Sequence, residues 1–476
     1  QPKARTYVVS PNDGYGWCEC GRCKAFDLVY AEGRKAEGGY PVTTDRVVRF
    51  VNEVTATVNR AYPDLLTQTL AYVNYVEPPS TFRPLKNSII WHCHYTPACY
   101  AHAIANPDCP ENAKFKAHLE RWLKVAPESL GIYAYTDKSM WFYLPRPVAQ
   151  PMAADIKLFH RLGIKYYYAQ SAGAVWAQNL PLYYLTAKLL WNVNEDVDAV
   201  VGDFYRCLFD DAARPMREFY AAFEKAAAKT GVHFNHSART EAPQFLTPEV
   251  MADARAKLDE AAGLAKPDPV AQRIAAVREH FERSYGLWDM IYNYYVYEET
   301  GKREYLQKAA ALLPKQLKAR GVDTWFAGQF RGIEQEAGAL GGLKWSGFGK
   351  EMTLGGRQCW NSDETGPGDN AAGWASFEFF LDDVTKPIRI RMLVWGKSEF
   401  SSLVICSEGR GKGLAAGGKW TPLKPDKPLS GQEQWDEMVF AVAPDKFEKG
   451  RQRQIVGFGG GDSQVWVAEA TVEAAK

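Results

Sequence analysis

The sequence predicts an α/β protein with a (β/α)8 TIM-type barrel, a helical region and a C-terminal antiparallel β-sandwich. Three observations along its 476 residues favour this fold class. Strands alternate with helices or long loops up to about residue 171, an almost purely helical period follows, and glycine-rich alternating runs begin after residue 320. The predicted domains are a catalytic barrel over 1–179, helices packed on the barrel over 180–320, and a jelly-roll-like sandwich over 321–476.

Short β-branched and aromatic runs define the strands of the predicted barrel. They comprise residues 6–10, 67–75, 87–95, 129–137 and 164–171. Amphipathic helices are expected from Thr44 or Asp45 to Pro63, over 112–127 and over 152–163. A complete barrel has eight strands. Either three strands are not recognisable in the sequence, or the sequence begins within the barrel and the barrel is incomplete at its N-terminus.

A change in the spacing of apolar residues along the chain predicts the two C-terminal regions. Runs with a period near 3.6 cover 181–191, 198–209, 213–229, 248–265 and 268–299. Alternating runs cover 374–383, 387–395, 400–408, 434–444, 454–460 and 464–473. Tryptophans make the sandwich a candidate carbohydrate-binding module, although large aromatic side chains more often fill such interiors: Trp345, Trp360, Trp374, Trp395, Trp420, Trp435 and Trp466.

Composition narrows the class of partner. The formal charge is +1 and no basic block stands out, so nucleic acid is not expected as a partner. No run of 18 apolar residues is present, so we expect no membrane span. Aromatic residues make up 13%, and their flat faces suit sugar rings as well as large cores. We expect a glycan or polysaccharide substrate and no cofactor.

Polar and aromatic residues gather where the predicted strands end. Chemistry in a (β/α) barrel sits at the C-terminal ends of its strands. The expected substrate-binding residues near these ends are Tyr75, His92, His94, Tyr135, Trp141, Gln170 and Trp176. His92 and His94 alternate on one strand and share a face, which is either the barrel mouth or a buried interior.

The candidate catalytic residues are Asp13, Asn12 and Asp137. Glycoside cleavage needs an acid for the leaving oxygen and a stabiliser for the positive centre, which is a second carboxylate or the acetamido group of the substrate. Asp13 would be the acid and Asn12 the partner of the acetamide. Asn-Asp-Gly also favours a plain turn, and Asp137 could instead cap a helix.

Cysteines cluster in the N-terminal region, where six of the nine precede residue 110. Cys18, Cys20 and Cys23 have CxCxxC spacing and could hold Zn²⁺ with His92, Cys93 or His94 as a fourth ligand. A disulfide with a spare thiol is the alternative, and we expect no metal because two clean CxxC pairs are absent.

Several spaced motifs carry a family resemblance. SPNDGYGWCECGRC, RVVRFVNEV, LAYVNYVEPP, WHCHYTPAC and LPLYYLTAKLLWNVNEDVDAVVGDFYRCLF resemble domain-of-unknown-function family 4838, whose members form glycoside hydrolase family 163. The resemblance covers about residues 5–225 and implies a (β/α)8 barrel in a secreted or periplasmic bacterial protein. It further implies a retaining, substrate-assisted endo-β-N-acetylglucosaminidase. The chain departs from the family pattern at Tyr133–Tyr135 and Tyr168–Gln170, where acidic residues are expected.

The leading functional hypothesis is therefore a glycoside hydrolase that cleaves N-acetylglucosamine-containing glycans. One alternative is a non-catalytic carbohydrate-binding protein that kept the barrel and lost an acid. Another is an α-glucuronidase-like hydrolase that uses two carboxylates.

Overall fold

The structure is a computed structural model. It describes residues 5–475 apart from 15, 37–38, 138–143, 172–177, 236–240, 266–267, 321–332, 335–336, 338–343, 347–350, 362–375, 382, 399–402, 409–418, 448–451 and 459–464. The chain forms two compact units, Gln1–Tyr285 and Gly286–Lys476, and each is described by itself. The predicted division at residues 179 and 320 stays a prediction.

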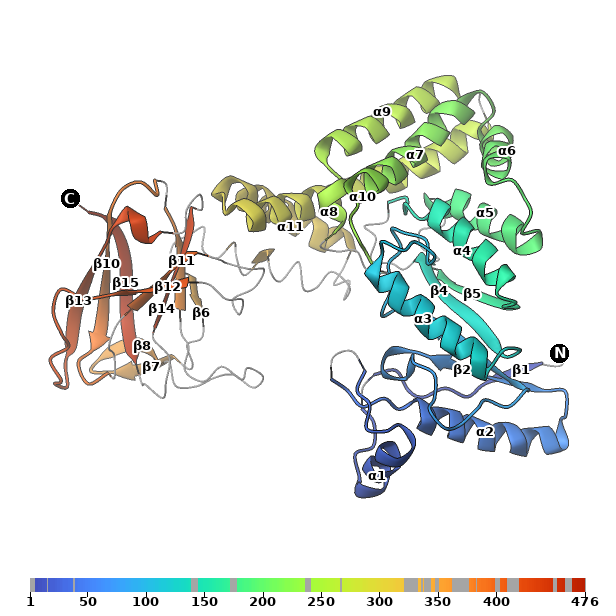
Figure 1. Cartoon of the computed structure of the whole chain (residues 1–476). Helices are drawn as coiled ribbons and strands as arrows, with labels where there is room; N and C mark the ends of the chain where they lie inside the picture. The colour runs from blue at the N-terminus through green and yellow to red at the C-terminus, as the bar shows by residue number, and fades with distance from the viewer. Residues whose placement is uncertain are drawn as a thin grey trace. The chain divides into compact units, whose positions relative to one another are not determined.

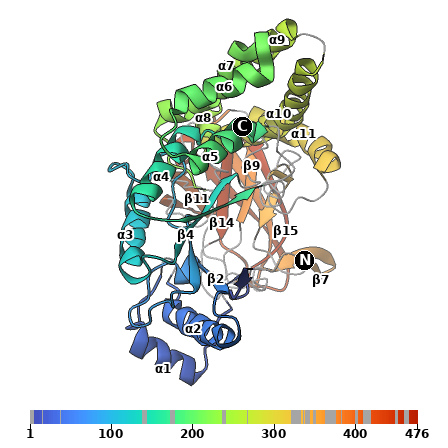
Figure 2. The same cartoon turned by 90° about the vertical axis from the view of Figure 1, so that its right-hand side faces the viewer.

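The first unit is built on a curled parallel sheet (Figures 1 and 2). Its strands pair in chain order, and all four pairings are parallel. The strands are β1 (Thr6–Val8), β2 (Leu66–Ala71), β3 (Ser88–Cys93), β4 (Leu130–Asp137) and β5 (Tyr166–Ser171). The predicted alternation of strands and helices is confirmed, whereas a complete eight-stranded barrel is not: the described part of this unit contributes five strands to the sheet.

Helices cover one face of this sheet, which we call the outer face. They are α2 (Thr44–Ala61), α3 (Pro110–Val125) and α4 (Ala149–Arg161). The core under them joins alternate strand residues to the apolar sides of the helices: Val48, Ala71, Ile90, Phe115, Leu119, Trp122, Leu130, Ile132, Ala134, Leu158 and Phe159. Burial of this apolar surface, at roughly 25 cal/mol per Å², stabilises the arrangement.

The valines that predicted α2 pack as expected. Val47, Val48 and Val51 are all at most 5% exposed. Asp45 in the first turn is fully buried, and its carboxylate accepts the backbone N–H groups of Ser80, Thr81 and Phe82 at 2.9–3.0 Å. These three bonds satisfy a buried charge and fix the loop after β2 to the helix.

Two local predictions differ from the structure. The strand expected over 67–75 ends at Ala71, and a 3-10 turn, Val73–Tyr75, follows it. A helix that the sequence did not indicate, α1 (Gly21–Tyr30), follows the cysteine-rich loop. Its Leu28 and Val29 are 68% and 67% exposed, so the apolar period that predicts a helix is missing there.

The rest of the first unit is helical, as predicted. Phe219 and Phe223 are fully buried between these helices, and the ring of Phe281 lies 5.7 Å from that of Phe219. The helices are α5 (Leu180–Trp191), α6 (Val197–Phe209), α7 (Ala213–Thr230), α8 (Ala242–Phe245), α9 (Pro248–Leu264) and the first part of α10 (Val270–Thr300).

The second unit contains the end of α10, α11 (Arg303–Arg320) and two antiparallel five-stranded sheets. The sheets have the orders β13-β10-β15-β8-β7 and β12-β11-β14-β9-β6, and both contribute to one apolar core, so the predicted sandwich is confirmed. The strands are β6 (Lys344–Ser346), β7 (Glu351–Leu354), β8 (Arg357–Asn361), β9 (Ser376–Phe380), β10 (Ile388–Trp395), β11 (Leu403–Glu408), β12 (Lys419–Leu423), β13 (Trp435–Val442), β14 (Arg453–Phe458) and β15 (Trp466–Ala474).

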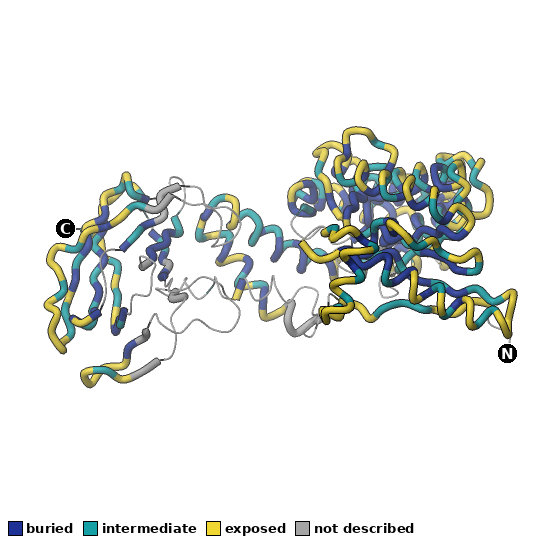
Figure 3. Tube along the Cα trace, turned by 60° about the horizontal axis from the view of Figure 1, so that its bottom comes forward, coloured by how far each residue is buried: buried dark blue, intermediate teal, exposed yellow. Residues whose placement is uncertain are grey.

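Within each unit, the strands and the helix sides that face them contain most of the buried residues (Figure 3). Trp395 and Trp435 of the sandwich are half-buried and meet edge to face at 5.2 Å. A search of the described helices finds none that is both long and apolar enough to traverse a lipid bilayer.

Candidate functional site

The face of the parallel sheet opposite α2–α4, the inner face, carries a set of aromatic rings. Strand register places Trp91 beside Gly131, and Tyr133 beside Tyr168, on this face. Side chains alternate between faces along a strand, so residues two apart in β4 and β5 add to the same set. We call this set the aromatic row: Tyr72, Trp91, Tyr95, Tyr133, Tyr135, Tyr166 and Tyr168.

The rings of the aromatic row form a chain of close contacts across four strands. Ring centroids are 4.9 Å apart between Tyr72 and Tyr95, and 5.0 Å between Tyr95 and Tyr135. The separation is 5.0 Å from Tyr135 to Tyr133, and 4.7 Å from Tyr133 to Tyr168. These are the distances of favourable tilted aromatic pairs, so neighbouring rings fix one another's orientation.

Trp91 lies at the more open end of the aromatic row. Its indole N–H donates to the side-chain oxygen of Gln68 at 2.7 Å, and its ring lies 6.2 Å from that of Tyr168. Tyr168 is 50% exposed, and Trp91 is half-buried. Gly131 leaves room for the indole, since a Cβ atom there would lie 2.7 Å from the Trp91 ring. A partly exposed Trp-Tyr pair of this kind presents flat apolar surface beside hydrogen-bonding groups.

Burial keeps the hydroxyls of Tyr72 and Tyr133 protonated. It raises the pKa of Tyr133 to about 12, and it raises the pKa of Tyr72 further, with a smaller contribution from Tyr95. The pKa of Cys93, between them on the inner face, is raised to about 12 by burial. Tyr72 and Tyr133 therefore offer neutral hydroxyl donors and acceptors at neutral pH.

Asp13 and Asn12 lie in the loop after β1, and both are exposed. The charge of Asp13 contributes to the raised pKa values of Tyr72 and Tyr75, which places this carboxylate near the Tyr72 end of the aromatic row. Within the described parts of the chain, Asp13 makes no hydrogen bond or ion pair, so its carboxylate is open to a ligand.

Of the next four predicted site residues, the structure describes the side chain of only one. Gln170 is half-buried, and strand alternation places it on the inner face with Tyr168. The backbone of Asp137 pairs with Ser171 at the end of β4, but its side chain lies outside the description. Trp141 and Trp176 also lie outside the described residues.

His92 and His94 face α3 rather than the inner face. His92 is fully buried and stacks on Phe115 at 4.5 Å, and His94 is 3% exposed with its Nε2 3.0 Å from Asn112. Burial lowers the pKa of His94 to about 4 and that of His92 well below its usual value. The expectation that these rings bind substrate at a barrel mouth is wrong, because the face that they share is the one covered by α3.

Tyr75 and Tyr135 are both buried. Tyr75 is 3% exposed and packs with Val47 and Val51 of α2, with Trp17 edge-on at 5.5 Å. It therefore supports the loop that carries Asp13 instead of presenting its own ring to a ligand. Tyr135 belongs to the aromatic row but is only 5% exposed, so it supports Tyr95 and Tyr133 from beneath.

The cysteines Cys18, Cys20 and Cys23 come together, with their sulfur atoms within 4.8 Å of one another. Hydrogen bonding, first from the backbone of Cys23, lowers the pKa of Cys20 to about 7. In the described residues no fourth His, Cys, Asp or Glu joins this group, and the proposed fourth ligands His92, Cys93 and His94 are buried in the sheet.

One basic side chain holds the CxCxxC loop. Arg46 of α2 pairs with the buried Asp27 and donates to the carbonyls of Cys18 at 2.8 Å and Cys23 at 3.3 Å. The loop is thus attached to α2 by a charged pair with few exposed atoms.

Of the residues predicted from the sequence, Tyr135 and Gln170 lie on this inner face, and most of the aromatic row was missed. The missed residues are Tyr72, Trp91, Tyr95, Tyr133, Tyr166 and Tyr168. A usable signal was present, because Tyr133 with Tyr135 and Tyr166 with Tyr168 are aromatic pairs two residues apart on adjacent strands.

Several solved structures are remotely similar to the chain, and two of them are described here. A GH115 4-O-methyl-α-glucuronidase with specificity for decorated arabinogalactans is 10% identical with a TM-score of 0.38, over 91% of this chain and 62% of that chain. The enzymatically active domain of tailspike protein 4 from bacteriophage CBA120 is 8% identical with a TM-score of 0.16, over 28% and 19%. The chain thus covers less than two thirds of either protein.

No curated protein matches the chain. The model of one family, described as a domain of unknown function (DUF4838), matches residues 1–221, a region that spans the whole parallel sheet and α1–α6. The resemblance predicted from the spaced motifs is confirmed, and residues 1–221 are identified as a DUF4838 domain.

Proposed function

We propose that the inner face of the DUF4838 domain binds a glycan and that Asp13 catalyses cleavage of its glycosidic bond. The observation that carries this proposal is the aromatic row, which ends in the open pair Trp91 and Tyr168. Sugar rings bury their C–H faces on such surfaces, while tyrosine hydroxyls and the amide of Gln68 can form hydrogen bonds with the sugar hydroxyl groups.

The proposed substrate class is a glycan that contains N-acetylglucosamine. Asp13 protonates the leaving glycosidic oxygen while the substrate's acetamido oxygen bonds to C1, and the C1–oxygen bond breaks. Asn12 orients the acetamide. Water then attacks C1, returns a proton to Asp13 and regenerates the acetamide, so one water is consumed. The support is the pairing of an acid with an amide in one loop and the motif resemblance.

The test uses the full chain and a glycopeptide with a chitobiose core, with released glycan measured by mass spectrometry and binding by calorimetry. We expect Asp13→Asn to abolish release but keep binding, and Trp91→Ala to weaken binding at least tenfold. Tyr62→Ala is the control, since Tyr62 is 65% exposed at the far end of α2. Unchanged release by Asp13→Asn would refute the assigned acid.

A glycan-binding protein without catalysis is the second candidate. The exposure of Asp13 favours it, because a general acid usually sits in a site that raises its pKa. Binding that needs Trp91, together with no release by the unaltered chain, would select this candidate. A secreted or periplasmic location stays a prediction.

A further inference from the structure

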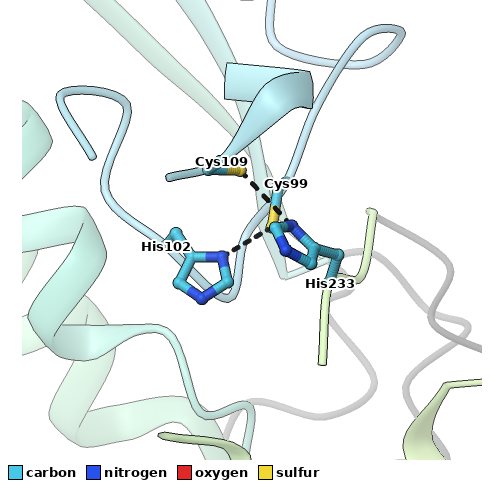
Figure 4. A group of neighbouring side chains, drawn as sticks. All are labelled: Cys99, His102, Cys109 and His233. Atoms are coloured by element: carbon cyan, nitrogen blue, oxygen red, sulfur yellow. Dashed lines mark hydrogen bonds between the residues drawn. The ribbon is translucent and has the colours of Figure 1, made fainter. Parts of the chain in front are cut away.

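Four metal-ligating side chains converge beside the start of α3 (Figure 4). They are Cys99 and His102 in the loop after β3, Cys109 at the start of α3, and His233 just after α7. One ligand atom from each lies within 4.8 Å of those of the other three.

The spacing within the group matches that of ligands around one ion. His102 Nδ1 lies 3.5 Å from Cys99 Sγ, and His233 Nδ1 lies 3.5 Å from Cys109 Sγ. Zinc bonds of about 2.3 Å to sulfur and about 2.05 Å to nitrogen, at tetrahedral angles, place S and N about 3.6 Å apart. These two sulfur–nitrogen distances are therefore already close to the edge length of a zinc tetrahedron.

A buried asparagine fixes the loop that supplies two of these side chains. Asn112 of α3 is fully buried and accepts the Cys99 N–H at 3.0 Å. Its amide group donates to the carbonyls of Cys99 and His102, both at 2.9 Å. The Tyr100 N–H donates to the carbonyl of Phe234 at 2.8 Å, which fastens the segment of His233 to the same loop.

The charges and dipoles around the four side chains favour a bound cation with thiolate ligands. Cys99 and Cys109 are fully buried free thiols. Cys109 caps the N-terminus of α3, where the helix dipole favours a thiolate. Glu111 Oε2 lies 3.3 Å from His233 Nδ1 and adds negative charge.

We propose that Cys99, His102, Cys109 and His233 bind one structural zinc ion. Binding releases the two thiol protons to solvent, and the two thiolates balance the charge of Zn²⁺. Two sulfur and two nitrogen ligands in a tetrahedron suit zinc, and four protein ligands leave no position open for substrate, as in structural sites. The ion joins the loop that follows Tyr95 to the segment after α7, which are 124 residues apart between Cys109 and His233.

The test measures zinc in the full chain with the second cysteine group removed. In a Cys18→Ser, Cys20→Ser, Cys23→Ser background, reduced protein is stripped with a chelator and titrated with Zn²⁺ against a chromophoric chelator. We expect one zinc per chain. We expect Cys109→Ser to abolish it, and the control Cys207→Ser, which changes an exposed thiol, to retain it.

His233→Gln provides a variant that should fold, since this side chain is 39% exposed. Its zinc affinity should fall by more than about 100-fold, because changes outside the ligands already cost about 10–100-fold. Cobalt bound in place of zinc should give tetrahedral d–d bands and thiolate charge-transfer bands that His233→Gln alters. Zinc uptake that survives both variants would overturn the proposal, and so would a chain without zinc that holds a Cys99–Cys109 disulfide.

Discussion

Asp155 of α4 makes the stability of the first unit depend on pH in an unusual direction. Its carboxyl group borders a cavity of ≈ 20 Å³ and accepts the Ile104 N–H at 2.7 Å. Burial raises its pKa from 3.8 to about 8, against the lowering effect of that hydrogen bond. The group is therefore protonated in the folded chain at pH 7 and ionised in the unfolded chain.

The sign of the effect follows from the protons bound in each state. Between pH 3.8 and about 8 the folded chain binds one more proton than the unfolded chain, so the free energy of unfolding falls as pH rises. At about 1.36 kcal/mol per pH unit, this costs about 4 kcal/mol at pH 7, and partial exposure of the side chain reduces the cost to about 2–4 kcal/mol.

Asp155→Asn tests this reasoning. The amide oxygen still accepts the Ile104 N–H, while no group ionises on unfolding. We expect the variant to be more stable than the parent by about 2–4 kcal/mol at pH 7 and nearly equal to it at pH 4, measured by urea denaturation of the full chain at both values. Asp64→Asn, at an exposed turn, is the control and should show no such pH-dependent gain. A gain equal at both pH values, or none at pH 7, would refute the assigned protonation.

Two further predictions concern the faces of the sheet. Gly131→Ala should destabilise the chain by about 1–3 kcal/mol and weaken glycan binding, because its new Cβ would lie 2.7 Å from the Trp91 ring and force the ring to move. Urea denaturation measures the stability and calorimetry measures the binding. If neither value changes, the close approach of Gly131 to Trp91 is contradicted. His92→Leu should stabilise the chain by about 1–3 kcal/mol, since both ring nitrogens are buried without a partner in the described residues. This gain should be larger at pH 5 than at pH 8, because the unfolded chain protonates His92 and the folded chain does not; denaturation at the two values checks it, and a gain larger at pH 8 would count against it.

The sequence predicted the element types well because local patterns determine them. The alternation of strands and helices, the valine face of α2 and the alternating runs of the sandwich are all visible within short windows. A period of two shows that His92 and His94 share a face but not which one. That choice depends on Phe115 and Trp122 of α3, which follow later in the chain and cover this face.

The two clusters of side chains were harder to predict because they join distant segments. The aromatic row collects residues that lie in or directly after four strands, and their contact depends on strand register. His233 approaches Cys109 across 124 residues, which no local spacing reveals. The CxCxxC motif is conspicuous in sequence, yet it gathers three sulfur atoms without a fourth ligand in the described chain.

The attachment of the CxCxxC loop through Arg46 has a practical consequence. The side chains of Arg46 and Asp27 are only 15% and 11% exposed, so dissolved ions reach their ionic contact poorly. Raising the ionic strength should therefore leave the segment between Asp13 and α2 in place. Salt can be varied in experiments on glycan turnover without loosening the part of the chain that carries the proposed acid.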